Sequence, residues 1–377
     1  MRLPSICYRR FRWGSVLLLV FMVVVVACDS EGGGSEPREG SGLDCTFPVE
    51  FLNEGANRGE ITPVNNPALL GASEAEEILP AFSGTDRVIA FPPSFHSSYP
   101  STPLAVPLDV LFESEVMNLD AWARRPLAIT FCPLTSSTLV FDREAINGAR
   151  FEISGLLLNN NNEDHPGNLV MVDTDEEESL WPQMSLGAVC GPDRGTRLTT
   201  LPAIEMQWAR WKELYPNTEV AIDGDKSRRS GQRATKRGME GEPLQLGSHR
   251  EVPLGRVLGI PSRERVGGGT GGIAIPFEDL DDGTPVRVVE VTVNREPIVV
   301  FWERAARAAM AFRTASSFSV QNENIVDDRT QSVWAVDGRA IEGARQGERL
   351  APIESAYIAA GRAWFDFQPD SELWESP

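Results

Sequence analysis

The sequence predicts a β-rich α+β protein made of two tandem, related lobes that pack as one globule. Short runs of β-branched and aromatic residues, bounded by turn residues, recur along the chain and are typical of strands. Only a few segments show the spacing of an amphipathic helix. The second half also repeats segments of the first in the same order, which indicates an internal repeat. With 377 residues, 41% of them hydrophobic, the chain can bury a substantial core.

The N-terminus has the three zones of a secretory signal peptide. A basic zone without acidic residues comes first, and it contains Arg2, Arg9, Arg10 and Arg12. The apolar run 16–27 follows, and it is shorter than the roughly 20 apolar residues that span a bilayer. The run ends in Ala27-Cys28, which resembles the bacterial lipobox. This resemblance implies cleavage before Cys28 and a membrane lipid on its sulfur. An ordinary signal peptide or a short anchor are the alternatives.

These features predict that the protein is located in the cell envelope. We expect a signal peptide over 1–27 and a lipidated flexible tether over 28–60, because the residues after Cys28 are rich in Gly, Ser and Glu. Asp29, directly after Cys28, does not decide whether the protein is anchored to the inner or to the outer membrane. The net charge of −19 disfavours nucleic acid as a partner, since phosphates require a basic surface.

Cysteine usage fits an oxidising compartment. With Cys28 acylated, the mature chain keeps Cys45, Cys132 and Cys190. One disulfide and one free thiol is the simplest arrangement. We expect the pair Cys45–Cys190, which leaves Cys132 free, although the sequence alone leaves the other pairings open.

The repeat divides the chain into two copies. Segments 87–91, 105–108, 126–129, 179–181 and 216–220 correspond in order to 256–260, 274–277, 297–300, 332–334 and 369–373. The first copy carries an insertion that includes 159–167. We therefore expect copy one over 61–223, a basic flexible linker over 224–250, and a degenerate copy two over 251–377.

Within copy one the patterns predict strands over 87–91, 127–131, 138–141, 151–154 and 169–172. A helix is expected over 107–118, with proline in its first turn. Apolar residues at helical spacing predict a second helix over 204–215 and its counterpart over 353–364.

Several segments of copy one resemble the bacterial family known as domain of unknown function 3179. They are RPLAITFCPLTSSTLVFDRE at 125–144, FEISGL at 151–156, NLVMVD at 168–173 and ESLWPQ at 178–183. Copy two resembles the weaker second half of many members. The family brings no assigned reaction, although some members are described as selenoproteins, which hints at redox chemistry.

The resemblance points to one site. Members show a Cys-Pro-Leu-Cys motif, which here reads Cys132-Pro133-Leu134-Thr135. They also carry His-Glu-x-x-Asn-Asp, which here begins at Ser114 and keeps Glu115 and Asn118 but ends in Leu119. A Cys-x-x-Cys pair can cycle between dithiol and disulfide or bind a metal, whereas one cysteine beside Thr135 can do neither alone.

We therefore take Cys132 and Glu115 as the candidate catalytic residues. The resembling segments supply further candidate binding residues: Asn118, Thr135, Ser154, Asp173, Ser179, Trp181 and Gln183. A buried structural role for Cys132 is the alternative. Its counterpart in copy two is Glu303, so copy two is expected to be purely structural.

Other patterns predict no metal or cofactor site. The three histidines are far apart in sequence, and the acidic run 173–178 lacks the spacing of a calcium loop. The glycine-rich stretch 267–272 lacks the Lys-Ser/Thr of a phosphate loop and is expected to be a connector.

The leading functional hypothesis is a membrane-anchored envelope lipoprotein of uncharacterised function that binds a small molecule or an envelope protein without catalysis. A thiol redox or metal-binding protein that uses Cys132 is one alternative. A structural scaffold of an envelope complex is another.

Overall fold

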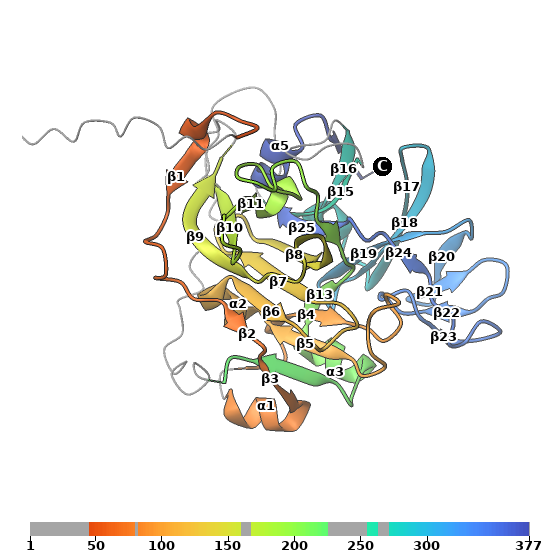
Figure 1. Ribbon diagram of the computed structural model, residues 1–377. Coiled ribbons are helices and arrows are strands. Elements are labelled where there is room, and N and C mark those ends of the chain that lie inside the picture. The colour runs from red at the N-terminus through yellow and green to blue at the C-terminus, as the bar shows by residue number, and fades with distance from the viewer. Residues whose placement is uncertain (1–44, 80–81, 160–166, 225–254, 263–270, 377) are drawn as a thin grey trace, which may run out of the picture. The chain divides into compact units, whose positions relative to one another are not determined.

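The computed structural model describes residues 45–79, 82–159, 167–224, 255–262 and 271–376 (Figure 1). Several expectations lie outside these residues: the signal peptide, lipid attachment at Cys28, most of the tether and of the basic linker, most of the insertion at 159–167, and most of the glycine-rich connector. Leu43–Pro377 forms one compact unit. Among the described residues, no helix is long and apolar enough to cross a membrane.

The fold is β-rich with short helices, as the sequence predicts. The α-helices in the described part of the chain are α1 (Ala72–Ile78), α2 (Leu108–Ser114), α3 (Trp208–Leu214), α4 (Phe277–Leu280) and α5 (Gly361–Phe367). The short 3-10 turns are η1 (Val49–Phe51), η2 (Glu144–Ile146) and η3 (Gln183–Ser185). Helices of this length are not stable alone, so packing against the sheets must hold them.

Residues 45–224, called here the first half, contribute to three sheets. A five-stranded sheet has the order β13-β4-β5-β14-β3. Its strands are β3 (Ala68–Gly71), β4 (Arg87–Phe91), β5 (Leu104–Pro107), β13 (Ile204–Gln207) and β14 (Glu219–Ile222). A four-stranded sheet has the order β1-β9-β10-β11. Its strands are β1 (Leu52–Glu54), β9 (Phe151–Leu158), β10 (Asn168–Asp173) and β11 (Leu180–Pro182).

A nine-stranded sheet joins the two halves of the chain (Figure 1). The first half supplies β2 (Val64–Asn65), β6 (Val116–Leu119), β7 (Leu127–Cys132), β8 (Ser137–Asp142) and β12 (Thr199–Thr200). Residues 255–376, the second half, supply β15 (Arg256–Pro261), β16 (Gly272–Pro276), β25 (Tyr357–Ala360) and β26 (Glu372–Leu373). The junction is the pairing of β25 with β8, at Ile358 and Thr138.

Two further sheets belong to the second half. One has the order β17-β18-β19-β24, and the other has β20-β21-β22-β23. Their strands are β17 (Val286–Val293), β18 (Glu296–Glu303), β19 (Ala308–Arg313), β24 (Ala351–Pro352), β20 (Phe318–Gln321), β21 (Asn324–Asp327), β22 (Val333–Trp334) and β23 (Ala340–Glu342).

The two halves have the same order of pairings. The run β13-β4-β5-β14 and the run β25-β15-β16-β26 each contain two antiparallel pairings followed by one parallel pairing. The hairpins β7–β8 and β18–β19 each follow one antiparallel strand, β6 and β17. A short strand then pairs with the second strand of each hairpin, β12 with β8 and β24 with β19.

The expected helices are wrong in part. The helix predicted over 107–118 ends at Ser114, because Glu115 has a positive φ of 56° and the next residues form β6. The helix predicted over 204–215 begins only at Trp208, since Ile204–Gln207 pairs with β4. The segment 353–364 divides in the same way, into β25 and α5. In each case strand pairing outweighed the helical spacing of the apolar residues.

Candidate functional site

Cys132 ends β7, where a four-residue turn leads into β8. It pairs with Ser137 across the hairpin. Its side chain is buried, with 1% exposure, and it is the free cysteine of the described residues. The turn contains Ser136 at a φ of +46°, a conformation that is uncommon for a residue other than glycine. The sequence therefore closes a tight turn directly beside the thiol.

A buried hydrogen-bond network surrounds this turn. Its amide groups belong to Asn168 and Gln183, and its hydroxyls to Thr130, Thr135 and Ser137. Asn168 Nδ2 lies 3.0 Å from Thr135 Oγ1 and 2.9 Å from Gln183 Oε1. Gln183 Nε2 donates to Thr130 Oγ1 at 2.8 Å, and Ser137 Oγ donates to Gln183 Oε1. All five side chains are at most 1% exposed. Together with Cys132 they are called the Cys132 network below.

The Cys132 thiol is kept neutral by its surroundings. Burial raises its pKa, and the negative charge of Glu115 raises it further. Hydrogen bonds from Thr135 and from the Leu169 backbone act in the opposite direction but do not reverse the shift. Because the thiolate is the reactive form, a raised pKa lowers the reactivity of this thiol at neutral pH.

Glu115 connects α2 to β6 beside the thiol. Its carbonyl accepts a hydrogen bond from the N–H of Phe131 at 2.8 Å, which extends the pairing of β6 with β7. Burial raises the pKa of its carboxyl to about 7. A left-handed backbone and a raised pKa at one residue are typical of functional positions, although structural sites also show them.

The second half has an apolar core at the position of this network. Its hairpin β18–β19 pairs Glu303 with Ala308 around a turn of the same length, and Arg307 has a φ of +48° where the first hairpin has Ser136. The register aligns Thr130, Thr135 and Ser137 with Phe301, Ala306 and Ala308. All three counterparts are fully buried. These three positions of the second hairpin are therefore apolar, whereas the buried Asp337, which interacts electrostatically with Glu303, is hydrogen-bonded by Tyr215 and Arg349.

Glu303 takes the place of Cys132 in the second hairpin. Its carboxylate forms an ion pair with Arg210 of α3 at 2.6 Å. Burial raises the pKa of Glu303, and the ion pair opposes this shift without cancelling it. The two equivalent positions thus contain different chemistry, a neutral thiol in one half and an ion pair in the other.

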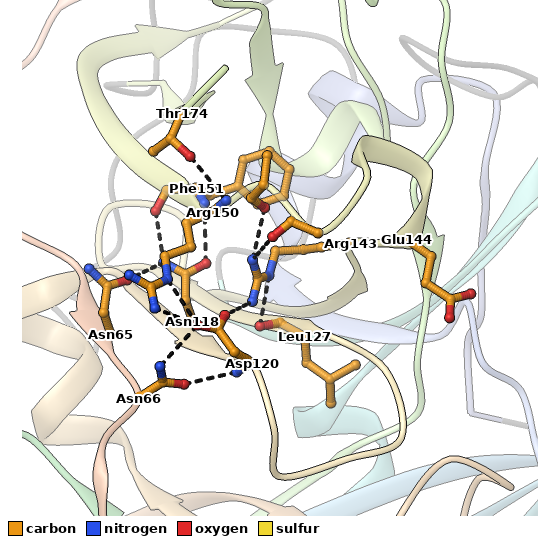
Figure 2. A network of polar contacts seen from close by, with 12 residues as sticks. Asn65, Asn66, Asn118, Asp120, Leu127, Arg143, Glu144, Arg150, Phe151 and Thr174 are labelled. Atoms are coloured by element: carbon orange, nitrogen blue, oxygen red, sulfur yellow. Dashed lines mark hydrogen bonds and ion pairs between the residues drawn. The ribbon is translucent and has the colours of Figure 1, made fainter. Parts of the chain in front are cut away.

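Asn118 belongs to a separate polar network, shown in Figure 2. Its side chain donates to Asn65 Oδ1 at 2.8 Å and to the carbonyl of Phe151 at 2.9 Å, and it accepts from the Phe151 N–H at 3.1 Å. Asn118 therefore ties β6 to β2 and β9. Both the nitrogen and the oxygen of the Asn118 amide are thus hydrogen-bonded within the protein, which indicates a structural role.

Asp120 forms the charged part of the same network (Figure 2). Partial burial opposes its ionisation, but hydrogen bonds from Arg150, Arg143 and Asn66 lower its pKa to about 2. Arg143 is fully buried and also donates to the carbonyls of Gly148 at 2.7 Å and Ala149 at 2.8 Å. These bonds hold the connection between β8 and β9.

Three more candidates form one turn. Trp181 Nε1 donates to Asp173 Oδ2 at 2.6 Å, and the Ser179 N–H donates to the same oxygen at 3.2 Å. Ser179 Oγ accepts the N–H of Asp193 at 3.0 Å, as Ser332 Oγ accepts an N–H at 3.1 Å in the second half. Because the second half repeats this contact, the turn has a structural explanation.

The remaining predicted residues also have structural partners. Ser154 Oγ donates to the carbonyl of Val170 at 2.6 Å, between β9 and β10. The expected disulfide Cys45–Cys190 is confirmed, with Cα atoms 4.2 Å apart. Of the candidates from the sequence, Cys132, Glu115, Thr135 and Gln183 come together at the β7–β8 turn, and Asp173, Ser179 and Trp181 come together at a second, separate turn.

Sequence reasoning missed Thr130, Ser137 and Asn168. A weak signal was present, because each is a polar residue within or at the start of a strand that lies in a segment resembling the family. In the described part of the chain, no group of three or more His, Cys, Asp or Glu side chains is arranged to hold a metal ion.

The comparison with protein families shows to which family the chain belongs. The model of the family described as "Protein of unknown function (DUF3179)" matches residues 58–371. The chain belongs to this family. The DUF3179 match covers both halves, so the second half is as much part of the family domain as the first. A search of the curated proteins and a search of the solved structures each found no match to the chain.

Proposed function

We propose that this DUF3179 protein is a lipid-anchored protein of the cell envelope that binds a small polar ligand at the Cys132 network without catalysing a reaction. Acylated Cys28 would hold it to the membrane lipid, with the glycine-rich segment after it as the tether. The disulfide Cys45–Cys190 supports an oxidising compartment. An envelope protein remains the alternative partner.

One observation carries the proposal. The first half buries hydrogen-bonding side chains where the second half has Phe301, Ala306 and Ala308. Well-packed apolar residues usually stabilise a core at least as well as a buried polar network. We therefore infer that the polar side chains at these positions of the first hairpin serve the recognition of a ligand. The positive φ of Glu115, whose carboxyl interacts electrostatically with Cys132, supports this interpretation.

The turn 133–136 is the proposed entrance. Leu134 at its tip is 50% exposed, while its neighbours Cys132 and Thr135 are buried. A movement of this short turn that breaks the hydrogen bond from the Ala360 N–H to the Thr135 carbonyl would open the network to solvent. Amide and hydroxyl groups would then offer both donors and acceptors, which suits an uncharged polar ligand such as a polyol, a sugar or an amide.

The test is a thermal-shift screen of the purified chain against such compounds. The site variant is Thr135→Val, which keeps the shape of the side chain and removes its hydroxyl, and the control is Thr292→Val at an exposed position of β17. A ligand near 100 times its Kd should raise the Tm by about 3 °C or more. We expect this shift in the wild type and in the control but not in Thr135→Val. No shift with any compound, or an equal shift in Thr135→Val, would reject the proposal.

Thiol chemistry is the second candidate, and one observation favours it. The carboxyl of Glu115 has a pKa near 7 and interacts electrostatically with Cys132. A carboxylate of that pKa is well matched to act as a general base at neutral pH. Rapid alkylation of Cys132 at neutral pH would favour this candidate over the binding protein.

We also propose that the two halves are copies of one unit and that the second copy is degenerate. The matching order of pairings and the positive φ of both Ser136 and Arg307 support this relationship. It implies that equivalent substitutions in the two halves, such as Gly191→Ala and Gly343→Ala, should have similar effects on stability.

A further inference from the structure

Tyr357, at the start of β25, buries a hydroxyl that has no partner. The side chain is 5% exposed, and its hydroxyl forms no hydrogen bond with any described residue. The hydroxyl of Tyr99, in contrast, donates to the carbonyl of Pro202 at 2.8 Å. The hydroxyl of Tyr215 donates to the carboxylate of Asp337. A buried polar group that is left unpaired is unfavourable, because it has lost its water without gaining a partner.

This hydroxyl belongs to the same part of the core as Cys132. Ile358 of β25 pairs with Thr138 of β8, so the neighbouring Tyr357 points to the opposite face of the sheet (Figure 1). On that face Tyr357 packs in one buried cluster with Cys132 and Leu139. The second half therefore contributes a side chain to the core that surrounds the Cys132 network.

A second unpaired hydroxyl belongs to the same region. Ser185 ends η3, the 3-10 turn that also supplies Gln183 to the Cys132 network. It is 2% exposed, and its Oγ forms no hydrogen bond with any described residue. Met184 and Leu186, on either side of it, pack in the same cluster as Tyr357. Two elements around the network thus each carry a buried hydroxyl without a partner.

The counterpart of Tyr357 in the first half is apolar. It is Ile204, which begins β13 as Tyr357 begins β25. The two residues pair with Ala90 and Gly259, each the fourth residue of its strand. An apolar side chain at this position avoids the cost of an unpaired hydroxyl. The hydroxyl of Tyr357 is therefore a candidate group for binding a ligand.

The core beside Cys132 also has smaller side chains than its counterpart in the second half. There Glu303, the counterpart of Cys132, forms an ion pair with Arg210, the third residue of α3. The third residue of α5 is Ala363, which packs in the cluster with Cys132. A thiol and a methyl group thus stand where the second half has a carboxylate and a guanidinium. These two positions leave more room for a ligand that enters under the turn 133–136 than their counterparts do.

We propose, resting on the function proposed above, that Tyr357 and Ser185 bind the ligand of the Cys132 network through their hydroxyls, and that this ligand is a neutral sugar. Sugar hydroxyls both donate and accept, as do the hydroxyl and amide groups of the network. The indole of Trp364 lies beside the ring of Tyr357, with centroids 5.0 Å apart, and aromatic walls of this kind are common in sites for small molecules.

The surroundings of Tyr357 favour an uncharged ligand. Burial raises the pKa of Tyr357, and no charged group of the described residues adds to this shift. A charged ligand at this position would lose its water without gaining a counter-ion.

Titration calorimetry of the purified chain with glucose and, separately, with N-acetylglucosamine tests the role of the two hydroxyls. Tyr357→Phe and Ser185→Ala each remove one hydroxyl and keep the rest of the side chain. Tyr99→Phe is the matched control, because it removes a buried hydroxyl from a different core cluster. Glucosamine and glucuronate, the charged analogues, test whether the ligand is neutral.

We expect at least one of the two neutral sugars to bind the wild type, and to bind Tyr357→Phe and Ser185→Ala about fivefold more weakly or worse, as the loss of one hydrogen bond predicts. The control should bind like the wild type. Without ligand, the Tm of Tyr357→Phe should be no lower than that of the wild type, whereas Tyr99→Phe should have a lower Tm because it loses a hydrogen bond.

The outcomes separate this proposal from the proposed function. Wild-type affinity in either Tyr357→Phe or Ser185→Ala would overturn it, and so would a charged analogue that binds as tightly as the neutral sugars. If neither sugar binds but a polyol or an amide does, with a loss in Thr135→Val, the proposed function stands and the sugar site is rejected. If no compound binds the wild type, both are rejected.

Discussion

The backbone N–H of Ala360 donates to the carbonyl of Thr135 at 2.8 Å, so the turn beside Cys132 is held by the other half of the chain. The relationship is reciprocal, because the N–H of Gln207 donates to the carbonyl of Ala306 at 2.9 Å. Each hairpin therefore docks on the strand and helix that end the opposite half. The Cys132 network lies behind one of these two contacts, and an apolar core lies behind the other.

The stability of the chain should depend on the ionisation of Glu115. Its pKa is about 7 in the folded chain, above the ordinary value of 4.5, so folding favours the protonated form. Below pH 4.5 the carboxyl is protonated in both states and has no effect. As the pH rises from 4.5 through 7, stability is lost, and the total loss is about 3 kcal/mol.

Glu115→Gln should remove this dependence. We expect the variant to match the wild type near pH 4.5 and to be more stable by about 3 kcal/mol at pH 8. Urea unfolding at the two pH values measures the difference, and Glu113→Gln on the exposed side of α2 is the control. Equal stability of wild type and Glu115→Gln at pH 8 would contradict the raised pKa.

Arg143→Lys should destabilise the fold strongly. Arg143 is fully buried, and its donors satisfy Asp120 and the carbonyls of Leu127, Gly148 and Ala149. A lysine cannot reach these acceptors together, so we expect a loss of about 3 kcal/mol in the free energy of unfolding. Arg150→Lys is a matched control, because Arg150 shares Asp120 but is 41% exposed. Urea unfolding should show a loss below about 1 kcal/mol for the control. Similar losses in the two variants would be inconsistent with this view.

Gly191 and Gly343 should be equally intolerant of a side chain. Their φ values are +91° and +92°, and a Cβ would approach Ser179 Cα and Ser332 Cα to 2.7 and 2.8 Å. Each alanine variant should lose at least about 2 kcal/mol, measured as a fall in Tm. Gly71→Ala, where nothing lies within 4 Å of the added carbon, is the control. A large loss at one position alone would argue against equivalent turns in the two halves.

The strands could be predicted from the sequence because their side chains have a local signature. Arg87–Phe91 was predicted with the bounds that the structure has, and the predicted strands 127–131 and 169–172 are each extended by one or two residues. β-branched and aromatic residues bounded by turns were sufficient for these. The helices were less predictable, since Ile204 has helical spacing to Trp208 but pairs with Ala90 of β4. That pairing depends on a distant segment, which no local pattern records.

The candidate site could be predicted only in part. The family motif indicated Cys132, Glu115, Thr135 and Gln183, which do lie together. Asn168 is also in the network, where the pairing of β10 with β9 brings it; it begins the family segment NLVMVD but was not among the predicted binding residues. Asn118 and Asp173 carried the same kind of motif signal and have structural partners instead. The pairing of the strands decides which motif residues reach the Cys132 network and which bind structural partners, and residue type alone does not reveal this pairing.

The rate of alkylation of Cys132 as a function of pH tests the central claim, a binding site with an unreactive thiol, most directly. In the unit from Leu43 to Pro377 the other two cysteines form the disulfide, so Cys132 is the thiol that an alkylating reagent can report. We expect slow alkylation, with an apparent pKa above the ordinary value of about 8.5, and rapid alkylation only after unfolding in urea. Rapid alkylation of the folded unit with an apparent pKa well below that value would contradict it and would favour thiol chemistry at this site.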